Sequence, residues 1–64
     1  MCLSTAYYNS KKEENVAARY VAEIRVEGDE VLLTDVMGKE MVIPGKILFV
    51  DLTGGTVVLQ AATA

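Results

Sequence analysis

The chain has 64 residues, of which 52% are apolar, and it carries nine acidic against six basic residues for a formal net charge of -3. This length suits one domain over residues 1–64 with a marginal core, and the acidic balance disfavours nucleic acid, whose binding requires clustered Lys and Arg. Because no apolar run approaches the roughly 20 residues of a membrane-spanning helix and no signal-peptide pattern follows Met1, we expect a cytoplasmic protein that does not contact membranes.

The first third of the chain predicts one strand and a polar loop. Residues 2–8 are rich in β-favouring residues and contain no breaker, so a strand is expected there. Residues 9–15 are polar and read as a solvated loop or short turn. Residues 16–22 fit either a helical turn or the beginning of a strand, and we expect an irregular or single-turn segment before the next strand.

A β-hairpin is the clearest pattern in the sequence. Residues 20–27 and 30–36 are expected to be strands, because apolar and polar residues alternate with the period of two that a half-buried strand requires. The two strands are separated by Gly28-Asp29. Glycine at the first central position is compatible with a two-residue type II′ turn, which needs a positive φ there.

The last third predicts three short strands joined by tight turns. Pro44 removes a ladder donor and Gly45 permits a sharp bend, so these two residues are expected to form a corner between strands. Gly54-Gly55 reads as a hairpin turn. The expected strands are residues 40–43, 46–52 and 56–60, and residues 61–64 are expected to fray.

Five or six short strands without a long helix predict an all-β fold, a small antiparallel SH3-like barrel that curls to remove its own edges. The segments 31–33 and 47–52 are apolar on both faces, which is typical of strands that cover a core on one side and a second protomer on the other. Small cores are supported by disulfides, a metal or a partner subunit, and because one cysteine forms no internal disulfide, a second copy of the chain is the expected support. We therefore expect a homodimer.

The sequence offers little for an enzyme. It has no histidine, no CxxC pair, no glycine-rich phosphate loop and no Ser/His/Asp set, so no catalytic or cofactor-binding residue is assigned. Carboxylate pairs occur at Glu13-Glu14 and Asp29-Glu30, but neighbours on a loop or turn are usually just hydrated. Thr5, Thr34 and Thr53 have no base nearby in the sequence.

Cys2 is the residue to which metal chemistry is assigned. Removal of Met1 would leave the α-amine and the thiol on one residue, with ordinary pKa values near 8 and 8.5, and a metal ion that displaces both protons would close a five-membered N,S chelate. Two copies would supply a square-planar N/S set suited to Ni(II) or Cu(II), although a tetrahedral Zn(II) site follows the same logic. The alternative is that Cys2 is a small apolar residue of the first strand.

The whole chain resembles the CooT family. The resemblance rests on the start Met1-Cys2-Leu3, on the run of residues 26–40 with Gly28, Asp29 and Met37-Gly38, on Gly45-Lys46-Ile47 and on Val57-Val58-Leu59. Members of that family are small homodimeric accessory proteins that bind nickel and are linked to maturation of carbon monoxide dehydrogenase. The resemblance implies an SH3-like barrel, Cys2 as metal ligand, one nickel ion shared by a dimer, and a nickel enzyme or its maturation machinery as partner.

A second function remains open. Related sequences are also described as RNA-binding, and an SH3-like module that contacts RNA or protein would use its aromatic and basic residues. The residues concerned are Tyr7, Tyr8, Lys11, Lys12 and Arg19. The acidic balance of the chain speaks against RNA, because a stacking surface for single strands is normally combined with a basic groove.

Overall fold

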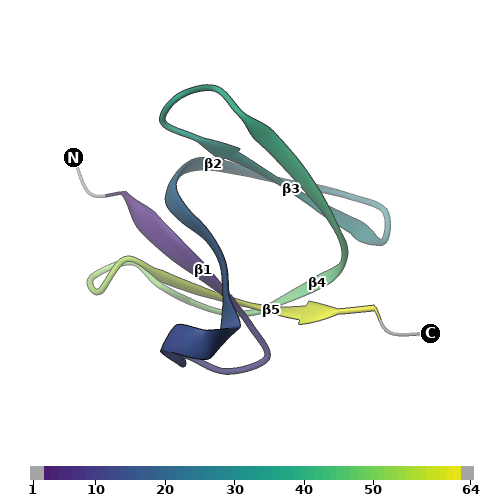
Figure 1. Cartoon of the computed structure of the whole chain (residues 1–64). Helices are drawn as coiled ribbons and strands as arrows, with labels where there is room; N and C mark the ends of the chain where they lie inside the picture. The colour runs from purple at the N-terminus through teal and green to yellow at the C-terminus, as the bar shows by residue number, and fades with distance from the viewer. Residues whose placement is uncertain (1–2, 63–64) are drawn as a thin grey trace.

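The structure is a computed structural model that describes residues 3–62, and these residues form five strands in a closed barrel (Figure 1). Neighbouring strands pair in the order β1-β2-β3-β4-β5, all antiparallel except β1 and β5, which close the ring in parallel. The predicted all-β barrel is confirmed. The elements are β1 (Ser4–Tyr8), a 3₁₀ turn η1 (Glu13–Asn15), β2 (Val16–Glu27), β3 (Glu30–Asp35), β4 (Glu40–Asp51) and β5 (Thr56–Ala61).

β2 is a long strand that changes partner along its length. Val16 and Ala18 pair with β1, whereas the residues after Val21 pair with β3. The chain kinks at Tyr20, which has a positive φ of 57°. The prediction of an irregular segment over residues 16–22 is therefore wrong, because pairing with β1 makes this segment the first part of the strand.

β4 is also long and bent, so the expected strands 40–43 and 46–52 are one strand. Pro44 is the last residue to pair with β3 and Gly45 the first to pair with β5. The corner is confirmed, but it does not interrupt the strand. Gly45 has a φ of 146°, and a Cβ atom added there would lie 2.0 Å from the backbone oxygen of Gln60. The bend therefore requires glycine.

The predicted hairpin between β2 and β3 is present. Glu27 and Glu30 are paired across a two-residue turn, and Gly28 has a φ of 59°. Asp29 is not among the residues with positive φ, so the positive value falls on the first central residue, as a type II′ turn requires. Of the strand predicted over residues 2–8, the structure shows Ser4–Tyr8, and residue 2 lies outside the described residues.

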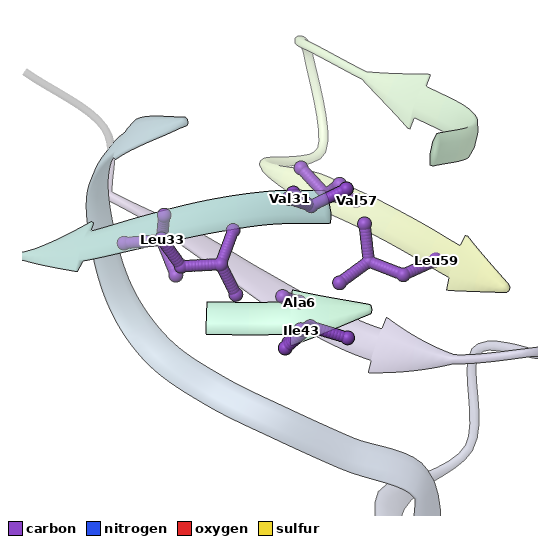
Figure 2. Packing of buried hydrophobic residues seen from close by; sticks show 7 residues of the cluster. Ala6, Val31, Leu33, Ile43, Val57 and Leu59 are labelled. Atoms are coloured by element: carbon purple, nitrogen blue, oxygen red, sulfur yellow. The ribbon is translucent and has the colours of Figure 1, made fainter. Parts of the chain in front are cut away.

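The core lies inside the ring and draws on every strand. Figure 2 shows side chains from β1, β3, β4 and β5 converging: Ala6, Val31, Leu33, Ile43, Val57 and Leu59, which together with Val21 of β2 form the buried cluster. Ala6 is the small residue among them, which lets β1 pack closely against its neighbours. Within residues 3–62, no helix has the length and apolar character needed to cross a membrane.

Candidate functional site at the amino end of the barrel

Cys2, the predicted metal ligand, lies outside the described residues. The residues that follow it show how the amino end of the chain is held against the barrel. The backbone N–H of Thr5 donates a hydrogen bond of 2.9 Å to the carbonyl oxygen of Gly55, and Ser4 is paired with Val21. The start of β1 is thus held between the β4–β5 turn and the kink of β2. This arrangement fixes the point at which the chain enters the barrel.

The β3–β4 turn lies at the same end of the barrel. Val21 is paired with Asp35 at the end of β3, and the N–H of Val36 donates to the carbonyl oxygen of Tyr20 at 3.0 Å. Figure 1 shows this turn, the β4–β5 turn and the start of β1 together at the left, with the β2–β3 turn and the end of β5 at the right. Three segments distant in sequence therefore surround the entry of the chain.

Side-chain carboxylates shape both of these turns. Asp35 Oδ1 accepts hydrogen bonds of 2.9 Å from the backbone N–H groups of Met37 and Lys39. Asp51 Oδ1 accepts one of 3.0 Å from the N–H of Gly54. These local bonds satisfy turn backbone groups and account for the two aspartates as structural residues.

Large apolar side chains are exposed at this end. Tyr20 is 62% exposed, Met37 is 86% exposed, and Val36 and Leu52 are also exposed. Isolated exposed apolar residues are ordinary, but several on neighbouring segments indicate a contact surface. The sequence analysis did not predict that Tyr20, Val36 and Met37 are exposed. For Val36 and Met37, exposure could have been predicted from their position directly before the turn residue Gly38.

A second apolar surface runs along β4, and we call its residues Tyr7, Leu48, Phe49 and Val58 the β4 apolar face. Val58 lies between the core residues Val57 and Leu59 and so points outward, yet it is only 7% exposed. Tyr7 and Phe49 are its partners on the two adjacent strands, which places all three side chains on one side of the sheet. Leu48 falls at a register shift and is exposed.

The predicted carboxylate pairs behave as surface groups. Glu13, Glu14, Asp29 and Glu30 are exposed, and Glu13 contacts Arg19 in an ion pair. In the part of the chain that the structure describes, no group of three or more Asp or Glu side chains is arranged to hold a metal ion.

The residues named for contact with RNA or protein lie in different surroundings on the barrel. Tyr8 packs against the core and Tyr7 lies beside Val58, so both rings are partly buried. Lys11 and Lys12 are exposed in the loop before η1, and the charge of Arg19 is offset by Glu13.

Comparison with known proteins connects this fold to one family. The family model described as "CO dehydrogenase accessory protein CooT" matches residues 1–60, a range that includes Cys2. A crystal structure of a protein assigned as CooT from Carboxydothermus hydrogenoformans superposes with a TM-score of 0.81, covering 97% of this chain and 100% of that one. At 24% identity, this likeness establishes the shared fold. None of the curated protein sequences compared with the chain matches it.

Proposed function

We propose that this chain, which belongs to the CooT family, is a homodimeric accessory protein that binds nickel as cargo and passes it to a carbon monoxide dehydrogenase or its maturation machinery. The observation that carries the proposal is the family match over residues 1–60, which begins at Met1-Cys2. Cys2 of each copy is the proposed ligand residue. The protein acts in the cytoplasm, where thiols stay reduced.

The chemistry follows from the position of the thiol. With Met1 removed, Cys2 offers its α-amine and its thiolate to one ion as a five-membered chelate. One chelate supplies two donors, and two chelates supply the four N/S donors that suit square-planar Ni(II). Leu3, the residue after Cys2, lies against the β4–β5 turn. A Cβ atom added to Gly55 of that turn would be 3.4 Å from the carbonyl oxygen of Leu3.

The β4 apolar face supports self-association. Leu48 and Phe49 are exposed and uncharged, and the strand continues to the exposed Leu52 in the turn that adjoins Leu3. Two chains that each carry a net charge of -3 repel one another, so a contact between them is best made through an apolar surface. In a twofold dimer the same face meets itself, which an uncharged face allows.

A site at the chain terminus is also suited to transfer. A cargo ion must leave the protein, and a site formed by two chain ends at a dimer seam can open without unfolding a strand. A closed cage inside the barrel would hold the ion but hinder its release.

The proposal is tested by removing or moving the thiol. Cys2→Ser is expected to keep the fold, seen as an unchanged circular dichroism spectrum, and to lose tight Ni(II) binding in calorimetry together with the thiolate-to-nickel charge-transfer absorption. A Cys2→Ser/Ser4→Cys double variant is the matched control, because it restores one thiol per chain but separates it from the α-amine. Undiminished nickel stoichiometry in Cys2→Ser would refute the proposal.

A further inference from the structure

The second half of β4 has one unpaired edge. Residues 46–51 pair with β5, whereas β4 pairs with β3 only as far as Pro44. Among residues 3–62, no other strand pairs with residues 46–51, so the backbone N–H and C=O groups that face away from β5 have no partner in a ladder. Such an edge is a template for pairing with another chain.

The side chains along this edge are apolar in the middle and charged at both ends. The segment reads Lys46-Ile-Leu-Phe-Val-Asp51. Val50 is paired with the buried Val57 and therefore lies on the inner side of the sheet, yet it is 43% exposed. An inward apolar side chain that stays exposed indicates that this edge of the barrel is open.

The order of the residues favours a second copy of the same segment as the partner. If two antiparallel copies are aligned about a twofold axis between Leu48 and Phe49, Lys46 of each copy lies opposite Asp51 of the other. The four residues between these two are all apolar, and they lie opposite one another. Opposite charges that face each other across paired strands are favourable, whereas like charges are destabilising.

A bulge allows this alignment. In a regular strand, Lys46 and Asp51 would point to opposite sides of the sheet, because side chains alternate, and the aligned residues would not match. The ladder between β4 and β5 shifts register at Leu48, which is one extra residue. Consequently Ile47 and Val50, both paired with core residues of β5, point inward, whereas Lys46 and Asp51 both point outward. Each of these two pairs therefore lies on one side of the joined sheet.

Both charged side chains have capacity for a new contact. Among the described residues, Lys46 forms no ion pair. Asp51 accepts the hydrogen bond from Gly54 through Oδ1, which leaves Oδ2. A lysine on an edge strand ordinarily discourages pairing with other chains. Here Lys46 makes the edge selective, because a strand without an acid at the matching position leaves the ammonium group unpaired.

We propose that two copies of the chain pair through the open edges of β4, antiparallel over residues 46–51, with Lys46 of each copy opposite Asp51 of the other. This contact is distinct from the one proposed to share a nickel ion. The β4–β5 turn, which adjoins Leu3, follows Asp51, so antiparallel pairing places the two amino ends at opposite ends of the joined sheet. The edge contact therefore joins copies whose thiols do not share an ion, and it does not depend on metal.

The test is sedimentation equilibrium of metal-free protein with a reductant present, so that Cys2 forms no disulfide between copies. The sedimenting mass of the unchanged protein is expected to rise with concentration. Lys46→Glu and Asp51→Lys each replace both opposite-charge pairs of the contact with like-charge pairs, and each should lower the association constant by roughly tenfold or more. An equimolar mixture of the two variants restores both opposite-charge pairs and should associate as the unchanged protein does.

Two further variants separate the charge from the fold. Asp51→Asn keeps an acceptor for Gly54 but loses the charge, and it should weaken association less than Asp51→Lys. Lys39→Glu, in the turn before β4, is the matched control and should associate normally. Amide hydrogen exchange within residues 46–51 should slow as the concentration of the unchanged protein rises, but not in Lys46→Glu.

Failure of this proposal is distinguishable from failure of the nickel function. If no nickel-sharing dimer forms, the same variants act on association of the monomer, and the charge effects are unchanged. The proposal is overturned if the sedimenting mass does not depend on concentration, if the mixture associates no better than either variant alone, or if Lys39→Glu has the same effect as Lys46→Glu.

Discussion

Ser4 of β1 is paired with Val21 of β2, the residue directly after the strained Tyr20. Val21 is in turn paired with Asp35 of β3, so one row crosses three strands at the amino end of the barrel. Because Val21 is buried, this row is anchored in the core. The point at which the chain enters the barrel is therefore attached to the core through Val21.

The dimer proposed to form through the β4 apolar face predicts the effect of a charge at Leu48. Leu48→Glu is expected to convert the dimer to a monomer in sedimentation equilibrium, because each copy would bury a carboxylate against the other. The number of nickel ions bound per chain should fall as well, since the two chelates no longer meet. Leu48 is 49% exposed and lies at a register shift, so the fold should tolerate the change.

The matched control for that variant is Val42→Glu. Val42 lies on the same strand and is 50% exposed, but it precedes the Pro44 bend and pairs with Leu32 of β3. It should remain dimeric. A dimeric Leu48→Glu, or a monomeric Val42→Glu, would place the contact between copies elsewhere on the barrel.

The free α-amine can be tested without changing the thiol. A protein that carries a Gly-Ser extension before Met1 keeps the sulfur of Cys2 but loses the adjacent amine. Loss of a residue that only hydrogen-bonds to a metal ligand typically lowers metal affinity by roughly 10- to 100-fold. Loss of the amine, a direct ligand, should lower the affinity for Ni(II) in calorimetry by more than that. Equal affinity with and without the extension would show that the amine is not a ligand.

Local patterns in the sequence predicted the hairpin and the corners, whereas strand continuity depended on distant pairing. Gly28-Asp29 is recognisable because the alternation on both sides and the glycine φ are local properties. The continuity of β4 is set by pairing of Gly45 with Ala61, far along the chain. The left-handed conformation of Tyr20 was not predicted either, and it lies where β2 changes from pairing with β1 to pairing with β3.

Substitution of a buried and an exposed valine on paired strands tests how much the core contributes to the free energy of unfolding. Val31 is fully buried, whereas its partner Val26 is 58% exposed. Val31→Ala should lower the free energy of unfolding by about 2 kcal/mol through lost burial and the cavity left behind. Val26→Ala should change it by less than about 0.5 kcal/mol.

That comparison is made by urea denaturation at one fixed protein concentration, because the proposed dimerisation would make stability depend on concentration. Equal effects of the two substitutions would mean that the exposed valine is buried in a contact between chains. A larger effect at Val31 alone would confirm that the barrel interior is the principal source of stability.

The bend of β4 makes the sharpest prediction about the fold. Gly45→Ala places a Cβ atom 2.0 Å from the carbonyl oxygen of Gln60, a backbone atom that cannot move without breaking the β4–β5 ladder. The loss of unfolding free energy should exceed about 3 kcal/mol, near the upper end for single substitutions. A domain of this size has a free energy of unfolding of only about 3–10 kcal/mol, so the variant should be largely unfolded or expressed poorly.

Gly28→Ala is the control, because a Cβ atom there meets nothing within 4 Å and only the positive φ is unfavourable, at a cost of about 1 kcal/mol. If both variants unfold at the same urea concentration, the close approach of β4 to β5 does not determine the bend.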